Sequence, residues 1–366
     1  MNLELLFNRT FLLLEFKTIF LGFISVFICV LVILFIFISL YSMYAAGLEA
    51  NKIKWKDGIT DLLSEAIFAE EEGGSPDISL ATKLLLKNRH YRQCCIDEII
   101  HTRKELSGSA CTALQLLYEK LELNRDSFKK LKNGGWLLQA KGIQELSSLQ
   151  QTKYVKNIFR LTTHDNEVVR NEAQCGLVNY YGFLGLRFLN VTTHPISEWQ
   201  QIQLLNKLTI AKPCNTAMMA RWLKSDMDSV VILALKLATF YNNLEVYDAV
   251  VNCLQHPEVK VKLRALEYLI KMQIANTADA MINAYSIDNK TFSLAIINAL
   301  KTVGTIQHVP FLLQQLNDND NEVKAAAAKA LAVVHPSGNA FLQAHSFAAI
   351  APWNQIFKQV TNELAA

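Results

Sequence analysis

The sequence lacks the short motifs by which many catalytic and cofactor-binding sites are recognised. It contains no glycine-rich phosphate loop, no G-x-S-x-G turn around a nucleophile and no C-x-x-C pair. Neighbouring acids such as Glu70–Glu72 lie in a linker-like stretch, and spacing alone does not hold two carboxylates in one pocket. We therefore predict no catalytic residues, no cofactor and no metal site, and we expect that the protein is not an enzyme.

Strong charge of either sign is also missing. The formal net charge is +3 over 366 residues, and no basic run stands out. A nucleic-acid-binding surface normally gathers many more positive charges, so no nucleic-acid partner is expected. With 51% hydrophobic and 19% charged residues, the composition argues against extensive disorder.

The cysteines form no disulfide framework. Seven are scattered along the chain, several of them at helical positions that should be buried. We interpret them as reduced core residues, which favours a reducing compartment. The only His/Cys cluster contains His90, Cys94, Cys95 and His101. Because no second close pair completes four ligands, this cluster is predicted to be ordinary helix rather than a metal site.

A long uncharged apolar run lies near the start of the chain. Residues 18–48 contain no charged side chain, and about 20 such residues are enough to cross a bilayer core of ~30 Å. A cleavable signal peptide would have a shorter apolar region and a basic start, although the small residues at Ala45–Gly47 keep cleavage open as an alternative. We predict one transmembrane helix over residues 18–48, preceded by an interfacial lead-in over residues 1–17.

The lysines after the apolar run indicate its orientation. Lys52, Lys54 and Lys56 follow the run closely, whereas Arg9 and Lys17 precede it. Basic residues accumulate on the cytoplasmic side of a span, so the C-terminal part of the chain is expected in the cytoplasm.

Residues 49–132 are predicted to form a helical linker or N-terminal cap, which could also consist of degenerate repeats. Its first helix, at 49–72, has one apolar face and ends at the stretch EEEGGSP. The members of this face are Ile59, Leu62, Leu63, Ala66 and Ile67.

From residue 133 to residue 335 the chain repeats itself every 30 or 31 residues. Small or apolar anchor residues recur at Gly142, Ala173, Leu204, Ala234, Ala265, Ile296 and Ala327. Four residues after the anchors stand Leu146, Leu177, Leu208, Ala238, Leu269, Leu300 and Leu331. Four residues before them stand Leu138, Val169, Gln200, Val230, Val261, Phe292 and Val323. A spacing of four places all three sets on one helical face, so the register predicts a helical repeat array.

Each repeat is expected to contain a first helix, a short turn and the anchored second helix. The first helices share a ladder at Leu223, Leu254, Tyr285 and Leu316. The turns carry N-cap residues, as in HDNE from His164, IDNK from Ile287 and DNDNE from Asp318. DNDNE lacks the glycine and the distal glutamate of a calcium loop, and so it is predicted to be a cap. Pro213 and Pro310 fall near the starts of first helices, and residues 336–366 are expected to form a C-terminal helical cap.

The second helices resemble those of HEAT repeats. The resemblance rests on DNEVVRNEAQCGL at Asp165–Leu177, HPEVKVKLRALEYL at His256–Leu269 and DNEVKAAAAKAL at Asp320–Leu331, and the period is similar to that of the short bacterial repeats. It implies an all-α fold, a right-handed αα-superhelix (HEAT-like α-solenoid), preceded here by the single transmembrane helix. At the basic ladder position of the family, Arg170, Lys262 and Lys324 match, whereas Gln201, Val231 and Ser293 depart from it.

The resemblance also implies a function. In HEAT arrays the second helices line the concave surface that binds partners, so Lys260, Arg264, Glu267 and Lys271 form the candidate partner-binding face. The helix at Val230–Tyr241 is apolar nearly all round, which predicts burial on more than one side, either by a neighbouring helix or by a partner or the membrane.

We expect a scaffold or adaptor for a protein partner, anchored through residues 18–48 in a bacterial inner membrane with the solenoid in the cytoplasm. Bacterial proteins of this kind often accompany membrane glycosyltransferases or polysaccharide-export machines. Two alternatives stay open: a HEAT-type enzyme similar to a bilin lyase, which would bind a tetrapyrrole, and an extracytoplasmic binding protein.

Overall fold

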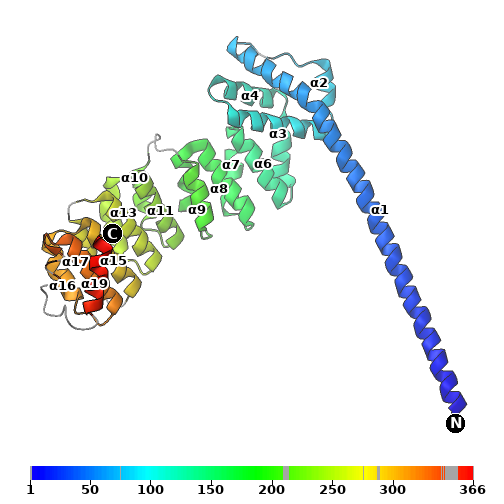
Figure 1. Ribbon diagram of the computed structural model, residues 1–366. Coiled ribbons are helices and arrows are strands. Elements are labelled where there is room, and N and C mark those ends of the chain that lie inside the picture. Colours follow the sequence, from blue (N-terminus) through cyan, green and yellow to red (C-terminus); the bar gives the residue numbers. More distant parts are fainter. Residues whose placement is uncertain are drawn as a thin grey trace. The chain divides into compact units, whose positions relative to one another are not determined.

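The computed structural model describes residues 2–74, 76–208, 214–274, 276–286, 289–338, 340, 342 and 353–365. Within this part of the chain every regular element is a helix, and no strand occurs. The chain divides into two compact units, Met1–Asp126 (unit 1) and Ser127–Ala366 (unit 2). The fold is therefore all-α, as the sequence predicts (Figure 1).

Unit 1 is dominated by one long helix, α1, at Asn2–Glu71. Figure 1 shows it as a continuous rod whose N-terminal part stands clear of the other helices of unit 1. The apolar side chains there are exposed, with Phe27 at 63% and Phe35 at 72%, and this part is long and apolar enough to be a candidate membrane span. An apolar surface of this size on a protein usually meets lipid or another protein.

The last turns of α1 are buried in a small helical core. Ile59, Leu62, Leu63 and Ala66 are covered, and Ile67 is half-buried, in agreement with the predicted apolar face. Unit 1 adds α2 (Leu80–Leu85), α3 (Arg89–Glu105) and α4 (Ser109–Lys120), and of these α3 and α4 pack on α1. The α1 helix ends just before Gly73, whose φ of +71° is a left-handed conformation that glycine adopts without strain.

The predicted His/Cys cluster lies mainly in this core. Cys94 and Cys95 are 8% and 1% exposed, and burial raises the pKa of the Cys95 thiol to about 12. A thiol with so high a pKa stays protonated at neutral pH and behaves as a small apolar group. Among the described residues, no group of three or more His, Cys, Asp or Glu side chains is arranged to hold a metal ion.

Unit 2 alternates first and second helices as the period predicts. The second helices are α6 (Trp136–Ser148), α8 (Glu167–Tyr181), α9 (Glu198–Asn206), α11 (Asp228–Phe240), α13 (Val259–Met272), α15 (Lys290–Val303) and α17 (Asn321–Val334). The first helices are α5 (Leu123–Asn133), which belongs to unit 2 from Ser127 onward, α7 (Val155–Arg160), the 3-10 segment η3 (Gly182–Asn190), α10 (Thr216–Trp222), α12 (Tyr247–Asn252), α14 (Thr277–Asn283) and α16 (Val309–Gln315). Unit 2 is a solenoid of paired helices.

The predicted register accounts for the core of unit 2. Every anchor residue is buried, and so is every residue four positions later. Four positions before the anchors the prediction fails once: Leu138 is 49% exposed, because it belongs to the first turn of α6, where Trp136 and Leu137 are exposed as well. The polar exception, Gln200, is nevertheless buried at 3% exposure.

Gly142 occupies an anchor position for a steric reason. A Cβ atom at this residue would lie 2.6 Å from the backbone oxygen of Ser127 and 2.7 Å from the backbone nitrogen of Leu131. Both atoms belong to α5, so the first pair of helices can approach this closely only with glycine at the contact.

The turns use the predicted capping chemistry. The side chains of Asn166, Asn289 and Asp320 accept hydrogen bonds from backbone N–H groups at the starts of α8, α15 and α17. Pro310 lies in the first turn of α16. Pro213 and Ile287 fall outside the described residues, as does much of the predicted C-terminal cap; its last helix is α19 (Trp353–Ala365).

Residues at the ladder position bond to their own turns even where the residue type changes. Arg170 Nη1 donates to the backbone oxygen of His164 at 2.6 Å, and Gln201 Nε2 donates to that of Ile196 at 3.1 Å. Ser293 Oγ likewise donates to the backbone oxygen of Ser286. Gln201 and Ser293 therefore satisfy turn carbonyls as Arg170 does, whereas Val231 has no polar side-chain atom with which to do so.

Candidate partner-binding site

A groove crosses three consecutive second helices of unit 2. Its volume is about 390 Å³, and we call it the seam groove. It is lined by Ile202 and Leu205 from α9, by Leu235, Lys236, Thr239 and Phe240 from α11, and by Arg264, Glu267 and Lys271 from α13. Seven of these nine lining residues belong to α11 and α13.

The cations of the seam groove are not equally engaged. Arg264 pairs with Glu267 at 2.6 Å, and Lys271 Nζ donates to the backbone oxygen of Thr239 at 2.8 Å. Lys236 makes no hydrogen bond or ion pair with any residue that the structure describes. It is therefore the cation best able to receive an acidic group from outside.

Lys236 is also electrostatically unfavourable where it stands. Partial burial lowers its pKa from the ordinary value, and the charge of Arg264 lowers it further, while Glu198 and Glu267 act in the opposite direction. A half-buried charge without a direct partner destabilises a fold, because the lost hydration is not replaced. An incoming carboxylate would relieve this penalty.

Two exposed apolar side chains lie on α9, and one of them, Ile202, lines the groove. Trp199 is 66% exposed and Ile202 is 45% exposed, and their spacing of three residues places them on one helical face. Phe240 is held by an edge-on contact with Tyr241, whose ring centroid lies 5.1 Å away. Exposed aromatic residues beside a charged group are the typical composition of a protein-binding hot spot.

Three of the four residues predicted as the partner-binding face meet in the seam groove. Arg264, Glu267 and Lys271 line it, whereas Lys260 lies at the other end of α13 in a separate depression of about 530 Å³. Acids at helix starts, including Asp228 in the first turn of α11, also line that depression. Such acids offset the positive ends of helices, so the depression has an explanation in local stability.

Sequence reasoning did not identify Lys236 and Trp199 as site residues. Lys236 is the single charged residue of the helix at Val230–Tyr241, and a lone lysine on an apolar helix was an available signal. The burial of that helix is as predicted, since Val230, Val231, Leu233, Ala234, Leu235, Leu237 and Ala238 are all covered.

Comparisons with known proteins agree with the repeat architecture. The family model for HEAT repeats matches residues 247–332, which contain α12 to α17. No curated protein sequence matches the chain.

Two solved structures are similar at low identity. Human deoxyhypusine hydroxylase in complex with glycerol is 12% identical, with a TM-score of 0.30, over 78% of this chain and 98% of the hydroxylase. The complex of CpcE and CpcF of phycocyanin lyase from Nostoc sp. PCC7120 is 13% identical, with a TM-score of 0.24, over 79% of this chain and 96% of that one. At these TM-scores neither likeness bears on function.

Proposed function

We propose that this HEAT-repeat chain is a membrane-anchored adaptor that binds a protein partner in the seam groove. The main observation in support of this proposal is Lys236, a half-buried cation without a direct partner in a groove that also exposes apolar side chains. A repeat surface serves binding well, because the stacked helices present a wide rigid face.

The membrane anchor is supported by α1. Its exposed apolar part is continuous with the turns that carry Ile59 and Leu63 in the core of unit 1. A bilayer would cover the apolar side chains that the protein leaves exposed. The lysines at positions 52, 54 and 56 favour the cytoplasmic side for the rest of the chain.

The chemistry of the groove defines the segment that it would bind. An aspartate or glutamate of the partner's segment would approach Lys236 and Arg264. Apolar side chains next to it in the same segment would cover Ile202 and Phe240. Such a segment combines an anchor in a pocket with charge complementarity, which sets specificity. The family resemblance suggests a membrane glycosyltransferase or a component of polysaccharide export as the protein that carries this segment.

Replacing Lys236 with methionine should separate binding from stability. The charge that destabilises the fold disappears, so the melting temperature should rise, whereas the affinity for the partner should fall about tenfold, or ~1.4 kcal/mol. The folded-state pKa of Lys236 lies below its ordinary 10.5, so the penalty exists at low and neutral pH and disappears as the pH approaches 10.5. Thermal melts at pH 7 and pH 10 and copurification from membranes measure both effects.

Lys224 provides a matched control, because it is an exposed lysine of the same repeat that does not line the groove. Lys224→Met should change neither the melting temperature nor partner recovery. Equal loss of the partner from both variants would mean that general surface charge, and not the groove, holds it.

The anchor is tested by extraction and by topology reporters. The chain should stay in the membrane during alkaline carbonate extraction. Of two reporters fused after Ala366, the one that works in the cytoplasm should be active and the one that works outside it should be inactive. Release by carbonate would contradict the anchor. Activity of the extracytoplasmic reporter would instead support the external binding protein.

A further inference from the structure

The segment Leu80–His90, which we call the basic segment, combines basic and apolar side chains without a single acid. Leu80, Leu84 and Leu85 are 75%, 56% and 39% exposed, and α2 buries none of its residues. Lys83, Lys87 and Arg89 are exposed, and they form no ion pair with a described residue. Exposed leucines beside unpaired cations are typical of a segment that lies at a membrane surface.

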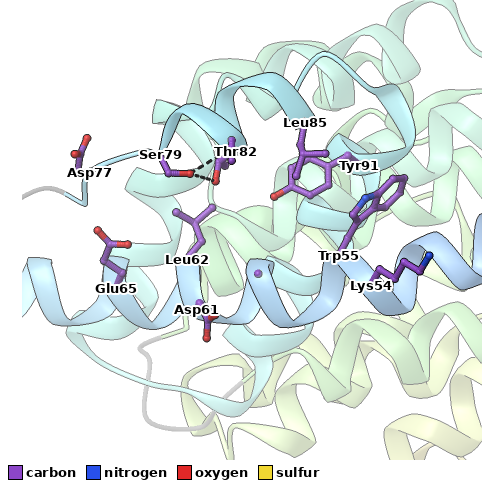
Figure 2. A pocket seen from close by; sticks show the side chains of 12 residues that line it. Lys54, Trp55, Asp61, Leu62, Glu65, Asp77, Ser79, Thr82, Leu85 and Tyr91 are labelled. Atoms are coloured by element: carbon purple, nitrogen blue, oxygen red, sulfur yellow. Dashed lines mark hydrogen bonds between the residues drawn. The ribbon is translucent and has the colours of Figure 1, made fainter.

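Contacts with α1 show in which direction this segment runs. A pocket of about 340 Å³ separates α2 from α1 (Figure 2). Figure 2 shows Ser79 and Thr82 beside Leu62, and Leu85 with Tyr91 beside Trp55. The rings of Trp55 and Tyr91 lie 5.5 Å apart and edge-on. The α2 helix therefore runs antiparallel to α1, and its C-terminal end points toward the apolar part of α1.

A further contact extends this register. His90 Nε2 lies 3.5 Å from the hydroxyl of Tyr44. Tyr44 belongs to the last turns of the uncharged stretch that ends at residue 48, where tyrosine is typical of the boundary between hydrocarbon and headgroups. The end of the basic segment consequently reaches the level of that boundary.

Contacts of the partly buried Arg92 side chain hold the end of the segment in place. The guanidinium of Arg92 pairs with Asp126 at 2.5 Å and donates to the backbone oxygens of Leu86 at 2.7 Å and Lys87 at 3.3 Å. The turn between α2 and α3 is thus fixed to the helical core of unit 1. Arg92 is a positioning residue, because its guanidinium is engaged by Asp126 and by these backbone oxygens.

We propose that the basic segment binds the phosphate groups of anionic phospholipids in the bilayer that α1 crosses. This inference rests on the proposed membrane anchor. Lys87 and Arg89, at the end of the segment nearest Tyr44, pair with the lipid phosphates, and Leu84 and Lys83 follow them on the headgroup side. The contact fixes the height of unit 1 above the membrane.

Photocrosslinking of the full chain in lipid nanodiscs tests the proposal. p-Benzoylphenylalanine replaces Leu84 in one protein and Phe68 in the other. Phe68 is 65% exposed on the same helix as Tyr44, but it lies 24 residues beyond it, or about 36 Å along the axis. Discs contain either zwitterionic lipid alone or about one-third anionic lipid, and phospholipid adducts are counted by mass spectrometry.

Position 84 should give at least tenfold more phospholipid adduct than position 68, with anionic lipid enriched in it. The combined Lys83→Gln, Lys87→Gln and Arg89→Gln changes should reduce the anionic adduct at least fivefold, with unchanged helical circular dichroism. Equal yields at positions 84 and 68, or equal adduct formation in both kinds of disc, would overturn the inference. Carbonate extraction distinguishes failure of the lipid contact from failure of the anchor. If the chain stays in the membrane but position 84 gives no phospholipid adduct, only the lipid contact is overturned.

Discussion

Ala265→Asp is expected to unfold the repeats around α13. Ala265 is fully buried, and the buried residues on either side of it on this helical face are Val261 and Leu269. A carboxylate there would have neither water nor a cation beside it, and an unpaired buried charge destabilises a protein by about 3–5 kcal/mol or more. Urea unfolding followed by circular dichroism should show a loss of this size or a chain that no longer folds.

Lys260→Asp is the matched control for this prediction. The side chain belongs to the same helix, but it is exposed, so the free energy of unfolding should change by less than about 0.5 kcal/mol. If the two variants were equally stable, the register anchored on Ala265 would be wrong.

Lys130→Ala should be nearly as damaging at the start of unit 2. Glu145 is 2% exposed, and both of its carboxylate oxygens lie 2.7 Å from Lys130 Nζ; Ser127 Oγ donates to it at 2.6 Å. Removing the ammonium leaves a buried carboxylate without its closest cation, which should lower the free energy of unfolding by about 3 kcal/mol. The loss is measured by the same urea titration.

Two further variants identify the cause of that loss. Lys132→Ala removes an exposed lysine from the same helix and should have little effect. Lys130→Met combined with Glu145→Leu removes both charges and should recover most of the stability, because apolar pairs often replace buried ion pairs without loss. A double variant as unstable as Lys130→Ala would show that shape, and not charge, decides this contact.

The periodic part of the fold could be predicted from the sequence. Burial recurs with the repeat, so one anchored helix such as that around Ala265 identified the covered positions of the others. Leu138 is exposed although it lies on the predicted face, because periodicity identifies a helix face but does not show how far along the helix neighbouring helices cover that face. Local capping was equally predictable, since Asn166 and Asp320 act on the backbone groups next to them.

The candidate site was only partly predictable. A helical pattern places Arg264, Glu267 and Lys271 on one face, but it does not show that Lys236 and Ile202 of other repeats line the same groove. Lys236 differs from its neighbours through what it does not contact, and such a difference depends on three-dimensional geometry. The depth of Leu84 likewise follows from the contacts of Trp55 and Tyr44, which are far from it in sequence.

Crosslinking in native membranes tests the adaptor most directly. A photoreactive residue replaces Ile202, which is 45% exposed in the seam groove, or Ile306, which is 56% exposed and lies outside it. We predict one discrete protein adduct from position 202, none from position 306, and loss of the adduct when Lys236→Glu is added. An adduct at position 202 that persists in the Lys236→Glu variant, or the absence of any protein adduct at position 202, would contradict the assignment of the seam groove as the partner-binding site.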